Sequence, residues 1–223
     1  KGFREFLYTA NAKMRFQAAI VAGGLGTRMQ PMGETPKGLL PVAGKPILEH
    51  LLAGFKDAGF SEVILCLGHG AEPIRGYFGD GSRWGLSLDY RVEETPRGTA
   101  GAVKDLGSAV KKDLLIVYGD LFVEMDLGAL LSFHESHRAP ATLVVRRTDH
   151  PEDSDLVELA GDGRIRAIGR LGAGKVSGDL GCAAVWVVRA GLLARVPKEK
   201  PSDFARDIFP AAIEDGEILM AYR

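Results

Sequence analysis

Short apolar runs alternate with stretches of helical spacing through the first half of the chain. The runs are rich in aliphatic and β-branched residues, which suits strands buried on both faces of a parallel sheet. Between Ile47 and Phe55 the apolar residues recur every three or four positions, and Gly59 ends that stretch. The pattern predicts strands over Ala18–Ala22, Glu62–Leu67, Leu86–Val92 and Asp113–Tyr118, and helices over Pro46–Ala58, Ala71–Phe78 and Thr99–Val110, the last capped by its threonine.

The second half carries more strands than helices. Gly161, Asp162 and Gly163 form a hairpin turn between two of them. We expect helices over Leu127–His137 and Phe204–Glu214, and strands over Ala141–Thr148, Asp155–Ala160, Arg164–Ile168, Leu180–Val188 and Ile218–Tyr222. This order predicts an α/β fold, a Rossmann-like, mostly parallel sheet flanked by helices, with a smaller antiparallel portion. Ligands of such sheets bind at the carboxyl ends of the strands.

Composition narrows the class of protein. With 223 residues, 46% of them hydrophobic, the chain can bury a full core, and we expect one domain over 15–223 preceded by an extension or appended segment over 1–14. The net charge of -1 gives no general attraction to nucleic acid or to an anionic membrane, and no apolar segment is long enough to span one. Cys66 and Cys182 lie in apolar runs and form no disulfide framework or metal cluster, so we expect a cytoplasmic protein.

A glycine turn follows the first predicted strand. Gly23, Gly24 and Gly26 allow backbone N–H groups to approach an anion, and Arg28 and Lys37 add positive charge. The sequence therefore predicts a phosphate-binding loop. An ordinary turn with two solvated charges is the alternative interpretation.

Two further stretches carry candidate chemistry. Asp120 follows the most apolar strand, where a carboxylate could hold a hard cation such as Mg²⁺, although aspartate after glycine is also common in turns. The segment from Glu94 to Ala102 is glycine-rich and runs into a helix N-terminus, which favours anions or carbonyl groups; alone, it could be a simple loop and cap. His134, His137 and His150 have no metal-ligand spacing, and we expect them to be solvated.

The longer pattern resembles a known family. Gly-Gly-Leu-Gly-Thr-Arg followed by Pro-Lys-Gly-Leu-Leu-Pro-Val-Ala-Gly-Lys-Pro is similar to the N-terminal signature of the sugar-1-phosphate nucleotidylyltransferases, and Glu94–Ala102 resembles the base-pocket segment of the mannose- and heptose-1-phosphate guanylyltransferases. The resemblance implies an enzyme that takes a nucleoside triphosphate and a sugar 1-phosphate with Mg²⁺ and releases pyrophosphate. Guanylyl transfer from GTP to mannose 1-phosphate or heptose 1-phosphate is the reaction that it favours. The resemblance also implies a nucleotide-binding half over 15–126 and a sugar-binding half over 127–223.

The resemblance assigns roles to particular positions. It implies catalytic roles for Arg28, Lys37 and Asp120, with Asp120 as the metal ligand. The implied nucleotide-binding residues are Ala22, Gly23, Gly24, Gly26, Thr27, Arg28, Glu93, Gly98 and Thr99. The implied sugar-binding residues are Asp155, Glu158, Arg170 and Lys175.

Four departures leave the finer function open. Arg97 replaces the usual leucine, Arg170-Leu171-Gly172 stands where relatives place a lysine for the sugar phosphate, and Cys182-Ala183-Ala184 replaces Asn-Ala-Gly. A second metal-binding aspartate would follow Arg223, so we expect a truncated chain or altered chemistry. The alternatives are uridylyl, cytidylyl or adenylyl transfer within the same fold, or a catalytically weak nucleotide-sugar sensor. A homo-oligomer is compatible with the enzyme and with the sensor.

Overall fold

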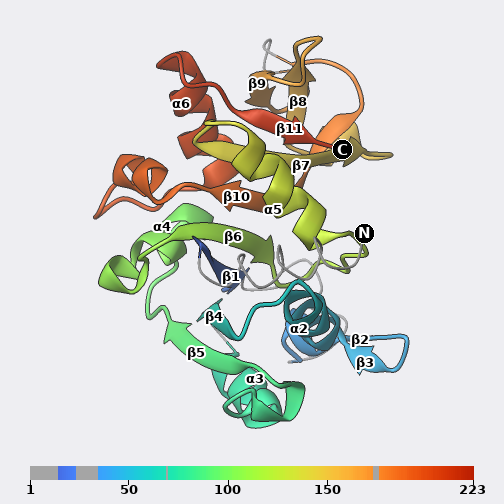
Figure 1. Ribbon diagram of the computed structural model, residues 1–223, viewed down its shortest axis with the longest axis vertical. Coiled ribbons are helices and arrows are strands. Elements are labelled where there is room, and N and C mark those ends of the chain that lie inside the picture. Colours follow the sequence, from blue (N-terminus) through green and yellow to red (C-terminus); the bar gives the residue numbers. More distant parts are fainter. Residues whose placement is uncertain (1–14, 24–34, 69, 173–175) are drawn as a thin grey trace.

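A nine-stranded sheet forms the centre of the molecule (Figure 1). The structure, a computed structural model, describes residues 15–23, 35–68, 70–172 and 176–223. The strands of the sheet are β1 (Phe16–Ala22), β4 (Glu62–Leu67), β5 (Ser87–Val92), β6 (Asp113–Tyr118), β7 (Ala141–Arg147), β8 (Leu156–Leu159), β9 (Ile165–Gly169), β10 (Leu180–Val188) and β11 (Met220–Tyr222). Their order is β11-β7-β10-β6-β1-β4-β5, with β8 paired to β10 and β9 to β8.

The first half of the chain builds a parallel sheet. β1 pairs in parallel with both β4 and β6, and β5 continues in parallel beyond β4. Each of these strands is an apolar run that the sequence predicts, because strands buried on both faces need apolar residues at consecutive positions. The predicted α/β fold with a mostly parallel sheet is confirmed.

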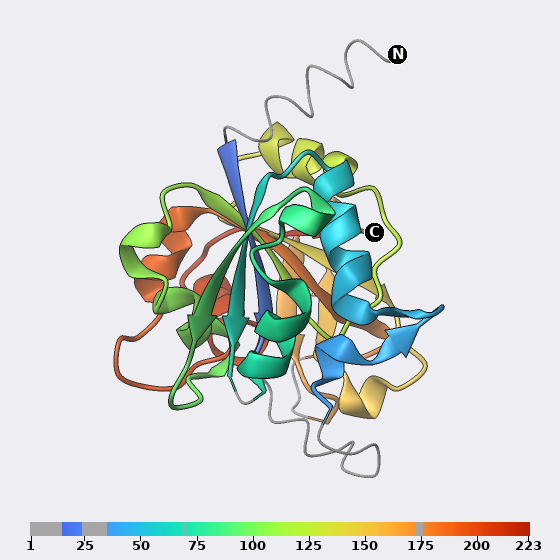
Figure 2. The ribbon, with the colours of Figure 1, turned by 90° about the horizontal axis from the view of Figure 1, so that it is seen from below.

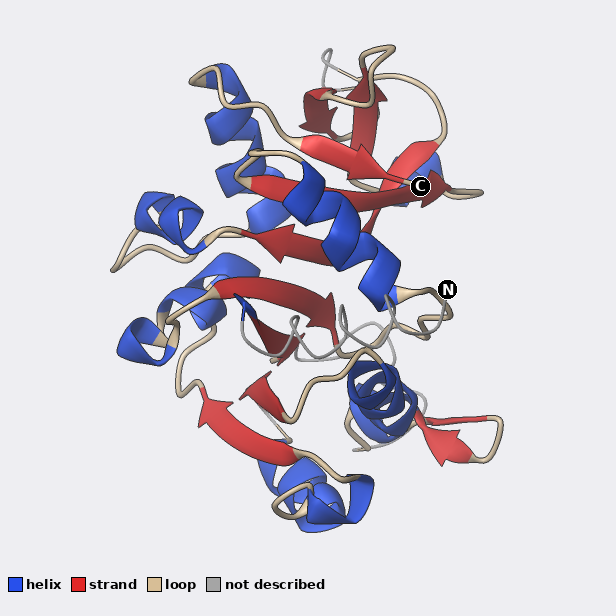
Figure 3. Ribbon diagram, viewed as in Figure 1, coloured by secondary structure: helices blue, strands red, loops and turns tan. Residues whose placement is uncertain are grey.

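Helices cover both faces of the sheet (Figure 3). They are α2 (Ile47–Asp57), α3 (Ala71–Phe78), α4 (Gly98–Lys104), α5 (Leu127–Ser136) and α6 (Phe209–Glu214), which follows a π-helical turn over Phe204–Ile208. Figure 2 shows α2 and α3 on one side of the strands and α4 on the other. Alternate residues of β1 serve the two sides, since Ala18 and Ile20 join the α2 side of the core and Ala19 and Val21 the α4 side.

Antiparallel pairing appears where the sequence predicts it. β10 runs antiparallel to β6 and β7, and β8 and β9 form the hairpin around Gly161–Gly163. The pairing of β10 with β7 shifts register between Cys182 and Trp186, and Ala184 in this bulge has a φ of 54°. The bulge bends the wall of the predicted sugar half.

Two predictions about local elements are wrong. The helix expected over Thr99–Val110 ends at Lys104, and a separate 3₁₀ turn follows over Gly107–Ala109. Thr99 does not cap it, because the helix begins at Gly98 and the Thr99 hydroxyl bonds to Asp203 and Phe204 instead. The sequence analysis also missed a small hairpin, β2 (Pro41–Val42) and β3 (Lys45–Pro46), that precedes α2.

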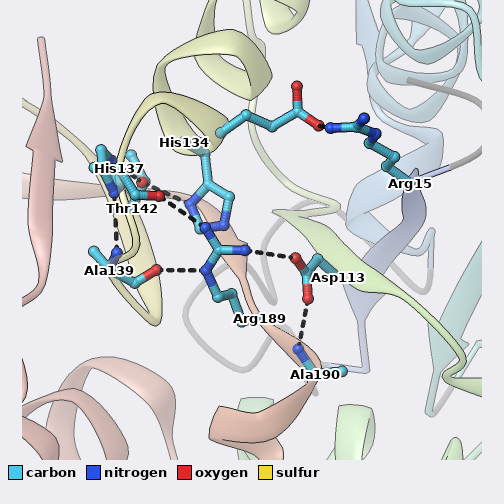
Figure 4. Close-up of polar contacts among 9 residues, drawn as sticks. Arg15, Asp113, His134, His137, Ala139, Thr142, Arg189 and Ala190 are labelled. Carbon is cyan, nitrogen blue, oxygen red and sulfur yellow. Dashed lines mark hydrogen bonds and ion pairs between the residues drawn. The ribbon is translucent and has the colours of Figure 1, made fainter. Parts of the chain in front are cut away.

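His134 is buried, which contradicts the expectation that it is solvated. Its Nδ1 lies 2.8 Å from Thr142 Oγ1, and His137 Nε2 lies 3.2 Å from the same oxygen. Beside them Arg189 donates to the carbonyl oxygens of His137 and Ala139 and pairs with Asp113 (Figure 4). This network ties the end of α5 to the starts of β6 and β7, so we assign it a structural role.

The two cysteines behave as core residues. Cys66 and Cys182 are free, and burial raises the pKa of both thiols to about 12. Such thiols hold their protons at neutral pH and are poor nucleophiles. Of the helices in the described part of the chain, none is long and apolar enough to cross a membrane.

Candidate active site

A cavity of about 220 Å³ lies at the carboxyl ends of β1 and β6. Its described lining comes from five segments: Val21, Ala22 and Gly23; Pro36, Lys37 and Gly38; Ile74; Thr99; and Tyr118, Gly119 and Asp120. A larger hollow of about 580 Å³ lies elsewhere, next to Gln17 and Glu62 at the opposite strand ends, and none of its described lining residues is a predicted site residue. The smaller cavity is therefore the candidate active site.

Lys37 and Asp120 meet at this cavity from positions 83 residues apart. Lys37 Nζ lies 3.1 Å from Asp120 Oδ2, and the two side chains are 33% and 44% exposed. Lys37 opens a 3₁₀ turn whose Gly38 packs on α2, where a β-carbon would lie 2.5 Å from Leu48 Cδ1. The pair places a cation and a carboxylate side by side with solvent access on both.

Glu93 directly follows β5, which lies two strands away from β1 in the sheet. A β-carbon at Gly23 would lie 3.0 Å from Glu93 Oε2, so this carboxylate packs closely against the end of β1. Burial raises the pKa of Glu93 above its ordinary value. The other oxygen, Oε1, is buried without a hydrogen-bond partner among the described residues, so its capacity to accept a hydrogen bond is unused there.

The N-terminus of α4 binds protein rather than an anion. The Ser202 carbonyl accepts hydrogen bonds from the backbone N–H groups of Ala100 and Gly101, and Ser202 N donates to the Arg97 carbonyl. Arg97, which replaces the family leucine, donates to the Lys198 carbonyl and pairs with Asp105. The glycine-rich segment is thus fastened to the residues that precede Phe204, here called the 198–203 strap.

Thr99 and Tyr118 extend the site toward this strap. Thr99 Oγ1 donates to Asp203 Oδ2 at 2.8 Å and accepts from Phe204 N at 3.2 Å. Tyr118 lines the cavity with Thr99, and burial, followed by the carboxylates of Asp203 and Asp155, raises the pKa of its phenol well above the usual range. The phenol therefore stays protonated at neutral pH.

Two guanidinium groups converge on Asp155. Arg170 Nε lies 2.9 Å and Arg206 Nε 3.5 Å from Asp155 Oδ1. Cations held at one carboxylate near Tyr118 could bind a second anion beside the cavity. Glu158 lies further along β8, half-buried, and no hydrogen bond or ion pair among the described residues joins it to this cluster.

A magnesium ion fits the residues present only if substrate completes its coordination. Among the described residues, no group of three His, Cys, Asp or Glu side chains could hold a metal. Asp120 nevertheless presents a partly exposed carboxylate over the cavity, and Mg²⁺ is commonly held by one or two carboxylates together with substrate phosphates. The site suits a metal that arrives with a triphosphate.

Of the predicted site residues that the structure describes, most lie in one region. Ala22, Gly23, Lys37, Thr99 and Asp120 line the cavity, with Glu93 and Gly98 next to it. The predicted residues Gly24, Gly26, Thr27, Arg28 and Lys175 lie outside the described residues. The stretch that holds Asp203 and Arg206 resembles the sugar half of the guanylyltransferases, but the sequence predicted no individual role for either residue, because their partners are far away in the chain.

Known proteins resemble this chain over most of its length. It is 33% identical over 208 residues to the mannose-1-phosphate guanylyltransferase of Mycobacterium tuberculosis, covering 92% of this chain and 58% of that one. It is 38% identical over 115 residues to a Campylobacter jejuni D-glycero-alpha-D-manno-heptose 1-phosphate guanylyltransferase, covering 51% of this chain and 52% of that one. The chain therefore spans about half the length of these curated relatives.

Solved structures share the fold. A Bacillus anthracis protein provisionally assigned as a glucose-1-phosphate thymidylyltransferase superposes with a TM-score of 0.83 at 21% identity, covering 93% of this chain and 86% of that one. Residues 17–177 also match the sequence profile described as nucleotidyl transferase, a range that holds the glycine turn, Lys37 and Asp120. The chain therefore belongs to the nucleotidyl transferase family, the sugar-1-phosphate nucleotidyltransferases that its motifs resemble.

Proposed function

We propose that the protein transfers the nucleotidyl group of a nucleoside triphosphate to a sugar 1-phosphate and releases pyrophosphate. The meeting of Lys37 and Asp120 at 3.1 Å, over a cavity that Ala22 and Gly23 line at the end of β1, is the observation that carries the proposal. Backbone N–H groups, a cation and a carboxylate are the parts that triphosphate binding requires. The guanidinium groups at Asp155 supply a separate place for the second phosphate.

The reaction needs positioning and charge neutralisation more than covalent chemistry. An oxygen of the sugar phosphate attacks the α-phosphorus in line, a P–O bond forms there, and the bond to the leaving pyrophosphate breaks. Lys37 would neutralise charge that grows on the α-phosphate, and Arg28 would hold the β- and γ-phosphates. Mg²⁺, held by Asp120 with phosphate oxygens, would supply further charge neutralisation.

We propose guanine as the base because of Glu93. Guanine presents a ring N–H and an amino group side by side, and one carboxylate accepts hydrogen bonds from both. Uracil and thymine place carbonyl oxygens on either side of one N–H, which a carboxylate repels. The unpartnered Glu93 Oε1 suits the guanine edge, and the guanylyltransferase names of the relatives at 33% and 38% identity agree with it.

Mannose 1-phosphate and heptose 1-phosphate are the first acceptors to test. Pyrophosphate release should be measured for a panel of nucleoside triphosphates and sugar 1-phosphates. We expect GTP with one of these acceptors to give the highest kcat/KM. Calorimetric binding of GTP without turnover with any acceptor would favour a nucleotide-sugar sensor instead.

The Glu93→Gln variant tests the base assignment. Glutamine offers one acceptor and one donor, so it mismatches the two donors of guanine, and we expect kcat/KM for GTP to fall about tenfold or more. Glu62→Gln is the matched control, since Glu62 is exposed and lines the hollow at the opposite strand ends. Equal loss in both variants, or no loss in either, would contradict a role for Glu93 in choosing the base.

A further inference from the structure

Asp203 joins two parts of the candidate active site that lie far apart in the chain. Its Oδ2 accepts the hydrogen bond from Thr99 Oγ1 at 2.8 Å. Its Oδ1 accepts a hydrogen bond from the backbone N–H of Ala205 at 3.0 Å. One carboxylate therefore holds both the first turn of α4 and the start of the π-helical turn.

Through Thr99, Asp203 is connected to the part of the site that we assign to the nucleotide. Thr99 lines the cavity with Lys37 and Asp120 and directly follows Gly98. Its single hydroxyl proton goes to Asp203, while its oxygen accepts from Phe204 N at 3.2 Å. Losing the carboxylate acceptor would leave this half-buried hydroxyl free to reorient, which would loosen the segment between Glu93 and Thr99.

Through Ala205, Asp203 is connected to the two guanidinium groups that contact Asp155. Ala205 is followed by Arg206, whose Nε lies 3.5 Å from Asp155 Oδ1, the oxygen that also binds Arg170. Asp203 caps the turn that carries Arg206, because its side chain accepts one of the first free N–H groups of that turn. The direction in which Arg206 points therefore depends on Asp203.

We propose that Asp203 is a positioning residue that fixes the nucleotide side and the sugar-phosphate side of the site relative to each other. It acts through Thr99 and Arg206, so no contact between Asp203 and substrate is required. The inference rests on the proposed function, since it assigns the two parts of the site to the two substrates of that reaction. It also gives the 198–203 strap a role beyond closing the N-terminus of α4.

Three variants distinguish the effect of the Asp203–Thr99 contact from that of the Asp203–Ala205 contact. Asp203→Ala removes both hydrogen bonds, and we expect the KM for GTP and the KM for mannose 1-phosphate each to rise about five- to tenfold, with a smaller change in kcat. Asp203→Asn keeps an acceptor for Ala205 N but turns an amide NH₂ toward Thr99, so only the KM for GTP should stay raised. Thr99→Val keeps the shape and removes the hydroxyl, and should resemble Asp203→Asn.

Thermal denaturation and a control variant far from the site test whether Asp203 has only a structural role. Asp215→Asn changes an exposed carboxylate that pairs with Arg195, and it should leave both KM values unchanged. A lower Tm in all three variants with both KM values unchanged in an active enzyme would overturn the inference alone. So would a failure of Asp203→Asn to restore the KM for the sugar phosphate. A wild-type protein inactive with every substrate pair would remove the proposed function and this inference together.

Discussion

Ala184 has a backbone conformation that its side chain disfavours. Its φ of 54° lies in the left-handed region, at the bulge where the register of β10 shifts. A β-carbon in this region costs about 1 kcal/mol relative to glycine. We expect Ala184→Gly to raise the free energy of unfolding by about 1 kcal/mol in urea denaturation. Ala183→Gly, the neighbouring change without a positive φ, should lower it, and a gain of equal size there would refute the strain argument.

Lys37 is the single residue on which turnover should depend most among those described. Removal of one group that stabilises transition-state charge lowers turnover by about a hundredfold or more, and we expect this from Lys37→Ala. Pyrophosphate release at saturating substrate measures it. Lys45→Ala is the control, since Lys45 pairs with Glu49 away from the cavity. Near-normal turnover of Lys37→Ala would contradict the assignment.

At the scale of elements, the junction between β5 and α4 is set by one close contact. Gly98 has a φ of 74°, and a β-carbon there would lie 2.4 Å from the Ser202 carbonyl oxygen. Neither backbone segment can retreat without breaking the hydrogen bonds from Ala100 and Gly101 to that oxygen. The close packing of the 198–203 strap on α4 therefore requires glycine at position 98.

Gly98→Ala should consequently destabilise the protein and disturb the site. We expect the free energy of unfolding to fall by about 2–3 kcal/mol, as backbone strain adds to the lost contact. Gly191→Ala is the matched control, because nothing lies within 4 Å of a β-carbon there. Urea denaturation of both variants measures the difference. A stability loss of the same size in Gly191→Ala would show that the Ser202 contact is not the cause.

For the whole molecule, the buried histidine network predicts acid sensitivity. Burial, aided by Arg189 and His137, lowers the pKa of His134 to about 3, and burial also lowers the pKa of His137. Folded His134 is therefore neutral at pH values where the unfolded chain, with an ordinary pKa near 6.5, binds a proton. Stability is complete above about pH 6.5 and falls below it, by about 1.4 kcal/mol per pH unit for this proton.

Chemical denaturation at pH 7.5 and pH 5.5 measures this dependence. His134→Gln removes the titrating group, so its stability should fall less between the two pH values than that of the wild type. His150→Gln is the control, because the His150 side chain is 79% exposed. The network would not explain acid sensitivity if His134→Gln kept the full wild-type slope.

The sequence by itself determined the order and type of most elements, and it predicted that Lys37 and Asp120 belong to one site. Strands such as Glu62–Leu67 and Asp113–Tyr118 were predictable because burial on both faces demands consecutive apolar residues. Lys37 and Asp120 were predictable because both lie in motifs that resemble those of the family, and Asp120 also follows the end of β6. The fold class follows from these local patterns.

Only the tertiary structure decided the residue roles that depend on contacts between residues far apart in the chain. The roles of Ser202, Asp203 and Arg206 arise where the strap meets α4 and Asp155, and no local pattern encodes such a meeting. His134 continues the buried face of Leu127, Leu130 and Leu131, so helical spacing could have predicted its burial, but its partner Thr142 comes from β7 and could not be predicted. Periodicity shows which side of an element is buried, but polar partners are chosen by packing, and packing is settled only when the whole sheet has formed.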